Sequence, residues 1–312
     1  MQLTTNTRAF IEAEQYSSFI LTNMHDGLLP TQFYRNVSDF GAGETLHIKN
    51  IGAAVIQEAS EDTPLIYNAI DTGEVTLTIT DFEGDAWYVT DVLRQDGAQI
   101  DQLMAERGAE STRALQESFE TKLLKACNDA QTDVAANNVA GFAHRISSTA
   151  GSNVLTLSDL ILMKVAFDKA QITISGRTAI LDPVTAATLD GLVTITRDVT
   201  PFGEKILENG FDRDHQFIMN LYGWNIITSN RLDKGDFSDG ITAVTGAVAN
   251  VFMSMVDDNH KPMMVAWRQQ PSVEGERNKD RGRDEFVTRQ RYGIGPQRVD
   301  TLGIYITSAT NI

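Results

Sequence analysis

Residues 43–93 read GETLHIKNIGAAVIQEASEDTPLIYNAIDTGEVTLTITDFEGDAWYVTDVL, and residues 94–126 continue with RQDGAQIDQLMAERGAESTRALQESFETKLLKA. The first stretch alternates apolar and polar residues, which predicts strands with one buried face. Its apolar positions are Leu46, Ile48, Ile51, Val75, Leu77, Ile79, Trp87 and Val89. A ribbon of two such strands is marginal in water, because it cannot bury a face against itself. Either the rest of the chain or a second copy must therefore cover it.

The second stretch predicts one long helix from about residue 95 to residue 130. Its apolar stripe contains Ile100, Leu103, Met104, Leu115, Phe119, Leu123 and Cys127. Gly108 interrupts this pattern and predicts a bend, since glycine costs up to about 1 kcal/mol in a helix interior. Polar residues cover the opposite face, which is either solvated or packed on the polar surface of a neighbour.

Composition places the chain among soluble globular proteins. At 312 residues, with 42% hydrophobic and 22% charged residues, it can bury a sizeable core in one large domain or two ordinary ones. Acidic residues outnumber basic ones by 42 to 26, which gives a net charge of −16. Such a surface repels nucleic acid and anionic membranes, so we expect neither specific DNA binding nor membrane binding.

The single cysteine and the lengths of the apolar runs limit the cellular compartments in which we expect this protein. Cys127 has no cysteine to pair with, so the sequence predicts no intrachain disulfide and favours a reducing compartment. Its place on the apolar stripe predicts an inert core thiol. No apolar run approaches the roughly 18 residues that a membrane helix needs. The N-terminal residues lack a basic segment leading into an apolar core, so we expect no secretory signal.

Further elements follow from periodicity and from turn residues. The pattern predicts helices at residues 7–26, 156–170, 184–192 and 241–256, strands at 178–181 and 221–229, a loop at 230–240, and two or three strands within 285–307. Asp182 and Pro183 end the strand at 178–181 and open the following helix, because proline is tolerated in a first helical turn.

Catalytic, cofactor and metal signatures are poor. Five histidines are scattered without an HExxH pair, and neither a phosphate-binding loop nor a GxSxG elbow occurs. Gly293-Ile294-Gly295 begins like a dinucleotide motif, but no helix opens after it, so we interpret it as a turn or bulge between strands. Asp233, Asp236 and Asp239 do not have the spacing of an EF-hand and predict a solvated acidic loop. We therefore expect no cofactor, no bound metal and no enzyme activity.

One basic cluster stands out late in the chain. It consists of Arg277, Lys279, Arg281 and Arg283, interleaved with Glu276, Asp280, Asp284 and Glu285. Mixed charges over so short a run favour a solvated loop or a salt-bridged contact between subunits over a track for phosphates.

The order of these pieces resembles the major capsid protein of tailed bacteriophages, with the Hong Kong 97-type fold. GETLHIKNIG is similar to the rising strand of that family's extended loop, and GEVTLTITDFEGDAWYVTDV to its return. The long helix resembles the spine helix of the peripheral domain. Three later segments, SGRTAILDPVTAATLDGL, LYGWNIITSNRL and RYGIGPQRVDTLGIYIT, resemble two axial-domain segments and the closing peripheral strands. Each pattern is short, and their joint occurrence in this order carries the resemblance.

The resemblance implies an α+β architecture in five parts. These are an N-terminal arm (residues 1–42), an extended β-hairpin loop (43–92), a peripheral domain with the spine helix (93–150), an α/β axial domain (151–265) and closing peripheral strands (266–312). In this family the extended loop lies across the neighbouring subunit. The missing partner of the ribbon is therefore expected to be another copy of the chain.

The implied function is that of a major capsid protein. Such a chain assembles into pentamers and hexamers that form an icosahedral shell around the double-stranded DNA of a tailed phage. It has no catalytic residues to carry over. The expected location is the virion, with assembly in the host cytoplasm, and the expected partners are other copies, a portal, a separate scaffolding protein and decoration proteins. The scaffolding protein is expected because the strand region begins by Gly43, too early for a built-in scaffolding segment.

Two groups of residues are the candidates for contacts between subunits. The apolar group consists of Ile66, Leu77, Ile79 and Trp87, and the charged group of Arg277, Lys279, Arg281 and Arg283. Large aliphatic and aromatic side chains dominate interface energies. The alternative is that these side chains face the subunit's own core, and for Trp87, near the hairpin base, the two interpretations are about even. On the first interpretation, Leu77→Asp leaves the subunit soluble and blocks shell formation.

Other functions stay open at this stage. Lys49 and Asn50 have nothing specific to mark them, so we expect no covalent crosslink between subunits. A bacterial encapsulin-like nanocompartment would share the fold and hold protein cargo. A tail-tube protein fits less well, because such proteins are β-rich and lack a helix of this length. An α+β enzyme would instead show a deep pocket with converging polar groups.

Overall fold

The computed structural model describes most of the chain. Its described residues are 33–37, 43–52, 54, 56–58, 61, 66–67, 69–70, 72–97, 100–131, 138–197 and 220–311. The expected helix at 7–26 and most of the expected arm at 1–42 lie outside them. The described helices are α2 (Asp91–Asp96), α3 (Ile100–Ala130), α4 (Leu157–Lys169), α5 (Pro183–Arg197) and the short η2 (Val299–Thr301).

The described strands form two larger sheets and two hairpins. They are β1 (Arg35–Asn36), β2 (Thr45–Ile51), β3 (Thr72–Thr78), β4 (Asp81–Thr90), β5 (Asn138–Val139), β6 (Phe142–Ala143), β7 (Arg145–Ser147), β8 (Arg177–Leu181), β9 (Asn220–Leu221), β10 (Trp224–Thr228), β11 (Lys234–Ser238), β12 (Ala243–Ser254), β13 (Met263–Asn278), β14 (Arg283–Pro296) and β15 (Leu302–Ser308). Among these residues the strand orders are β1-β13-β14-β4 and β7-β15-β12-β8-β10-β9, with β11 on β12. β2 pairs only with β3, and β5 only with β6.

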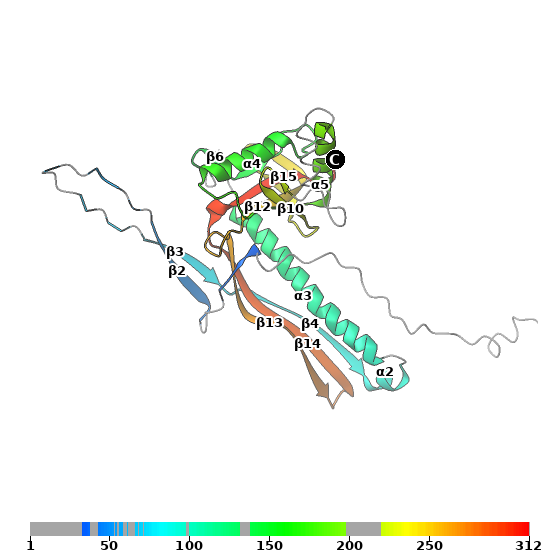
Figure 1. Cartoon of the computed structure of the whole chain (residues 1–312). Coiled ribbons are helices and arrows are strands. Elements are labelled where there is room, and N and C mark those ends of the chain that lie inside the picture. Colours follow the sequence, from blue (N-terminus) through cyan, green and yellow to red (C-terminus); the bar gives the residue numbers. More distant parts are fainter. Residues whose placement is uncertain are drawn as a thin grey trace, which may run out of the picture.

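Helix α3 lies along the β1-β13-β14-β4 sheet, and together they form an elongated arm below the second sheet (Figure 1). Phe119 fixes the helix near the top of the arm, because its ring packs against Tyr34, Trp267 and Tyr292. Beside this aromatic contact the packing becomes polar. Lys122 Nζ lies 2.5 Å from a carboxylate oxygen of Asp81. Part of the polar face of the helix therefore packs on the subunit's own sheet.

The second sheet carries the larger buried core. Phe167 of α4 packs edge-on against Trp224, which in turn packs edge-on against Phe252. The predicted helix at 156–170 and the predicted strand at 178–181 are confirmed as α4 and β8. The Thr156 hydroxyl accepts a hydrogen bond from the Asp159 N–H and caps α4, as threonine commonly does. Every residue of β8 is buried, from Arg177 to Leu181.

The sequence prediction was wrong for three segments near this sheet. Residues 241–256, expected to be a helix, form strand β12, which is buried along its last eight positions. A strand buried on both faces shows a continuous apolar run, which periodicity cannot separate from a buried helix. The loop expected at 230–240 contains β11. β13 was not predicted; its Pro271 lies where the register between β13 and β14 shifts, a place where a strand tolerates proline.

The extended loop is shorter than the expected hairpin of residues 43–92. β2 and β3 form an antiparallel ribbon that projects from the body (Figure 1). β4, in contrast, pairs with β14 along its whole length and belongs to the four-stranded sheet. The final strand also differs from expectation. β15 pairs with β12 and β7 in the second sheet, so the last residues do not all close the first one.

Gly293 and Gly295 mark the place where the base of the ribbon crosses β14. A Cβ on Gly293 would lie 2.9 Å from the Cα of Ile79, and one on Gly295 would lie 2.9 Å from a methyl carbon of Leu77. Such distances leave no room for a side chain. The glycine pair expected to form a turn or bulge thus sits inside a strand and admits a close crossing.

Cys127 is fully buried in the main core, beside residues of α3, β12 and β15. Burial raises the pKa of its thiol to about 12, so the reactive thiolate is suppressed near neutral pH. We predict that N-ethylmaleimide at neutral pH leaves the native chain unmodified and labels it fully in denaturant. Mass spectrometry of the two samples checks this result. Rapid labelling of the native chain would place the thiol at the surface and contradict the core assignment.

Candidate assembly surfaces

The distal part of the β2–β3 ribbon presents apolar side chains to solvent. Tyr67 is 99% exposed, Ile56 95%, Ile70 80%, and Ile51 and Ile66 are each 74% exposed. Single exposed apolar residues are ordinary, but five on one projecting hairpin make it a candidate interaction site. We call these five residues the ribbon patch. Of them, the sequence had singled out only Ile66, although apolar side chains in an acidic, polar hairpin tip were a readable signal.

Gln57 holds the ribbon in its extended form near this patch. Its side-chain amide donates to the Ile66 carbonyl at 2.8 Å, and its Oε1 accepts from the Ile66 N–H at 3.0 Å. The side chain thus satisfies both backbone groups of Ile66, at a point beyond the residues that pair β2 with β3. Ile66 is therefore presented outward from a fixed backbone.

Leu77 and Ile79 correct the expectation for the ribbon's apolar group. They are only 1% and 2% exposed, and they pack with Met264 and Ala266 of β13. The base of the ribbon is thus covered by the subunit itself, and these two side chains have no surface to offer another copy. Leu77→Asp would bury a carboxylate in this cluster and destabilise the subunit, contrary to the expectation of a soluble variant.

Trp87 lies apart from the ribbon, on β4. Its ring stacks on Phe286 of β14, with centroids 4.2 Å apart. The side chain is half-buried within the subunit. Of the four apolar candidates, the structure therefore leaves Ile66 freely exposed, Trp87 partly so, and the other two buried.

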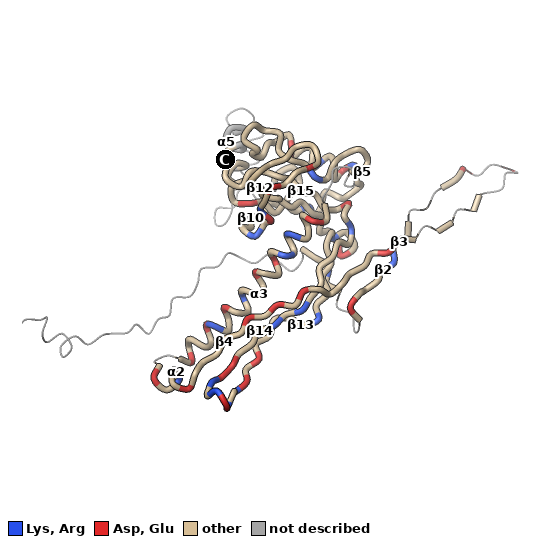
Figure 2. Tube along the Cα trace, turned by 180° about the vertical axis from the view of Figure 1, so that it is seen from behind, with Lys and Arg blue, Asp and Glu red and all other residues tan. Residues whose placement is uncertain are grey.

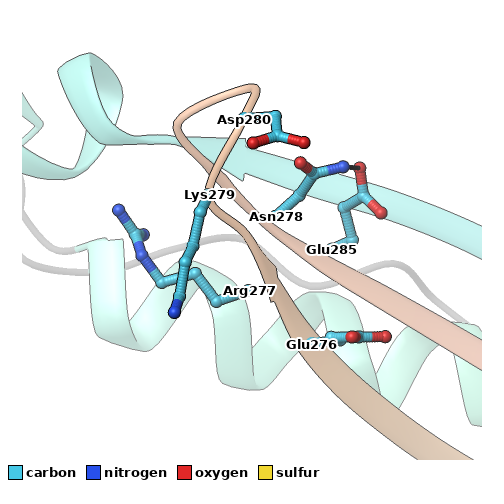
Figure 3. A pocket seen from close by; sticks show the side chains of 6 residues that line it. All are labelled: Glu276, Arg277, Asn278, Lys279, Asp280 and Glu285. Carbon is cyan, nitrogen blue, oxygen red and sulfur yellow. Dashed lines mark hydrogen bonds between the residues drawn. The ribbon is translucent and has the colours of Figure 1, made fainter.

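The charged candidates gather at the turn between β13 and β14, beside α2; Figure 3 shows Arg277 and Lys279 there. Arg277 forms a two-pronged pair with the Asp91 carboxylate, both contacts at 2.9 Å, and also reaches Asp284 at 2.9 Å. Arg94 of α2 contacts Asp284 at 2.5 Å. We call these four residues the tip cluster. It ties the outermost turn of the sheet to α2.

Hydrogen bonds from arginines lower the pKa values of two carboxylates near this turn. The bond from Arg277 holds the pKa of Asp91 below its usual range. The bond from Arg283, at 2.6 Å, does the same for the pKa of Glu285. Lys279 and Arg281 are exposed at the turn itself. The structure thus brings all four basic candidates to one end of the molecule and uses Arg277 and Arg283 for contacts within the subunit.

We predict that Asp91→Asn loosens this turn, because Arg277 loses its two-pronged partner. Limited trypsin digestion followed by mass spectrometry should show faster cleavage after Arg277 and Lys279. Lowering the pH should loosen the turn in the same way. Because the pKa of Asp91 is lowered in the fold, its carboxylate stabilises the folded state fully above the ordinary aspartate pKa, and this stabilisation is lost as the pH falls through the lowered pKa.

Glu276→Gln is the matched control for Asp91→Asn. Glu276 neighbours Arg277 on β13, and its carboxylate takes no part in the ion pairs of the tip cluster. Equal cleavage rates in the two variants would show that the Asp91–Arg277 pair does not hold the turn.

A buried polar network joins the end of α3 to the second sheet. Arg145, 5% exposed, donates to the carbonyls of Gln131 at 2.6 Å and Ser238 at 2.7 Å. It also donates to the side-chain oxygen of Asn128 at 2.8 Å. Gln131 in turn donates to the Leu302 carbonyl at 2.7 Å. The long helix is therefore clamped at its C-terminal end.

Neither a metal cluster nor a membrane helix is found among the described residues. Within those ranges, no three His, Cys, Asp or Glu side chains are grouped so as to hold a metal ion. None of the described helices is both long and apolar enough to cross a membrane. The surface hollow at the tip is lined by mixed charges and is open to solvent (Figure 3).

Comparison with known proteins gives a consistent result. The family described as phage capsid protein matches residues 73–307, well over half of the chain. The search of curated protein sequences found no match to this chain. Among solved structures, the capsid of cyanophage P-SCSP1u is similar with a TM-score of 0.72 and 14% identity, covering 98% of this chain and 94% of that one.

Two further solved structures show the same fold. One, from Mycobacterium phage Che8, has a TM-score of 0.67 and 17% identity, and the match covers 97% of this chain and 98% of that one. The mature capsid of bacteriophage PhiM1 has a TM-score of 0.71 and 11% identity, and the match covers 97% of this chain and 93% of that one. The expected α+β fold of the Hong Kong 97 type is confirmed. The chain belongs to the phage capsid protein family and is a major capsid protein, a structural component of the virion shell.

Proposed function

We propose that copies of this capsid protein assemble into pentamers and hexamers in which the ribbon of each copy lies over its neighbour. The observation that carries this proposal is the ribbon patch. A hairpin that projects from the body with five exposed apolar side chains buries them only against another molecule. The hydrogen bonds between Gln57 and Ile66 preserve that reach before assembly.

The shell is proposed to enclose the double-stranded DNA of a tailed phage without binding a particular sequence. The net charge of −16 supports this, because an acidic lining does not neutralise phosphates and lets packed DNA move. The mixed charges on α3 and on the sheet agree with a surface of low phosphate affinity (Figure 2). Assembly is proposed to occur in the host cytoplasm.

Electron microscopy of the purified chain tests this proposal. The sample is expressed alone and together with the products of neighbouring genes, at matched concentrations. Closed shells, or curved sheets of five- and six-membered rings, are the expected result. Only small discrete particles in both samples would contradict the proposal, and would require the ribbon patch to be covered in another way.

A separate scaffolding protein, a portal and decoration proteins stay predictions of the family resemblance. Co-expression tests for the scaffolding protein, because a scaffold should raise the yield of uniform shells and should be absent from the mature particle. A protein-filled nanocompartment is not favoured, because the family match is to phage capsid proteins. DNA-free shells loaded with one co-purified protein would reverse that preference.

A further inference from the structure

Three polar side chains lie in one row across the second sheet. Strand register places Arg177 of β8 directly opposite Ser254 of β12, in an antiparallel pair. On the other side, β10 runs parallel to β8 with Asn225 opposite Thr178, so Trp224 lies next to Arg177. Residues in register on neighbouring strands point to the same face of a sheet, and their Cα atoms lie about 5 Å apart. We call Ser254, Arg177 and Trp224 the polar row.

The polar row lies beneath helix α4, in the interior of the subunit. All three side chains are fully buried. Phe252, two positions before Ser254 on β12, belongs to the same apolar core as Trp224, so Ser254 points toward that core as well. The Arg177 guanidinium carbon lies 5.7 Å from the ring centroid of Phe167 on α4 and 5.7 Å from that of Trp224. Bulk solvent therefore does not reach the polar row.

One atom on each of these side chains has no hydrogen-bond partner among the described residues. The three atoms are Nη1 of Arg177, Nε1 of Trp224 and Oγ of Ser254. The large majority of buried polar side-chain atoms in proteins are hydrogen-bonded, either to the protein or to ordered water. Three such atoms on three adjacent strands therefore point to a ligand that they share.

The remaining nitrogens of Arg177 are satisfied within the subunit. Nη2 donates to the Asp168 carboxylate at 2.7 Å and to the Ile172 carbonyl at 2.6 Å. Nε donates to the Thr173 carbonyl at 3.0 Å. Asp168 thus balances the buried guanidinium charge. Lys164 also contacts Asp168, but from a partly exposed position where solvent screens its charge. A neutral ligand fits this balance better than an anion, whose charge would stay unmatched in the core.

We propose that the polar row binds a single water molecule between β12, β8 and β10. Its oxygen accepts hydrogen bonds from Nη1 of Arg177 and Nε1 of Trp224, and one of its hydrogens is donated to Oγ of Ser254. Three hydrogen bonds are about what a buried water makes in a protein. Through Arg177, this water joins the segment after α4 to strand β12. The inference concerns the folded subunit and does not depend on how copies assemble.

A density map that resolves ordered water tests the site directly, from shells by electron microscopy or from crystals of the subunit. The expected result is one isolated peak within hydrogen-bond distance of all three atoms. No peak, or separate peaks that each touch one side chain, would overturn the proposal. Crystals grown with bromide in place of chloride distinguish an anion, because an anomalous peak at the polar row would show that the ligand is not water.

Ser254→Ala tests the same site by stability. If the hydroxyl holds the water, its loss should raise the equilibrium constant for unfolding by about threefold to tenfold, as the loss of one buried hydrogen bond does. If the hydroxyl has no partner, its removal should leave this constant unchanged or lower it. Urea denaturation of the full chain, followed by circular dichroism, measures the constant. An unchanged or lowered value would overturn the proposal.

A double-mutant cycle shows whether the partners share one ligand. Trp224→Phe removes the indole N–H and also leaves space in the core, and the cycle with Ser254→Ala cancels the effect of that space. A shared water predicts that Trp224→Phe changes the unfolding constant less in the Ser254→Ala chain than in the wild type. Two factors that simply multiply would overturn it.

Trp267→Phe is the matched control for this cycle. Trp267 packs against the other large core, beside α3, and its substitution should multiply with Ser254→Ala. If Trp224→Phe prevents folding, Ser254→Ala and the density map still decide the outcome. These measurements are made on the folded subunit, so a failure to form shells would overturn the proposed function and leave the buried water standing.

Discussion

Replacing Ile66 and Tyr67 together by aspartate should abolish shell formation and leave the subunit folded. Both side chains are at least 74% exposed, so neither contributes to the subunit's own core. In a shell they would enter an apolar contact, where each well-packed anchor is worth about 2 kcal/mol or more. Two buried carboxylates per contact, repeated at every copy, exceed what weak capsid contacts can offset.

Sedimentation and electron microscopy measure the loss of shells, and circular dichroism checks the fold. The matched control is Ile66→Val/Tyr67→Phe, which keeps the ribbon patch apolar and should assemble normally. A second control, Glu58→Gln, changes an exposed polar residue on the same hairpin. Wild-type amounts of shell from the double aspartate variant would remove the ribbon patch from the contacts between copies.

Arg145→Ala should lower the free energy of unfolding by about 3–5 kcal/mol, because buried acceptors without a partner cost about 1–3 kcal/mol each. The substitution leaves the carbonyls of Gln131 and Ser238 and the amide oxygen of Asn128 without their donor. Denaturation by guanidinium chloride, followed by tryptophan fluorescence, measures the change.

Arg113→Ala is the control for this variant. Arg113 forms an ion pair with Glu117, one turn along α3, and this pair is partly exposed and should contribute less than about 1 kcal/mol. If the two alanine variants had equal stability, the buried network at the end of α3 would not hold the helix to the second sheet.

Local signals predicted a good part of this fold. These signals act between residues that are close in the chain, so they can be recognised in the sequence. They are the Thr156 cap, the Asp182-Pro183 pair after a short buried strand, and the long apolar stripe of α3. The long helix begins later than predicted, at Ile100 and not near residue 95, and it continues through Gly108, where a Cβ would meet no atom within 4 Å. Gly97 instead ends the short helix α2.

The rest depended on contacts that the sequence does not display. Whether Leu77 faces a neighbour or the subunit's own core depends on β13, a strand that lies far along the chain and was not predicted. Similarly, β15 reads as a continuation of β14, but its partners are β12 and β7. The alternation of apolar and polar residues shows that one face of a strand is buried, but it does not identify the element that covers this face.

The crossing at Gly293 and Gly295 sets the direction in which the ribbon leaves the subunit. The backbone of Thr78 and Ile79 lies against Gly293, and the Leu77 side chain fills the space beside Gly295. Leu77 and Ile79 are also buried against Met264 and Ala266 of β13. A side chain at either glycine would push the base of the ribbon away from β14, so these two glycines fix the direction of the projecting ribbon relative to the body.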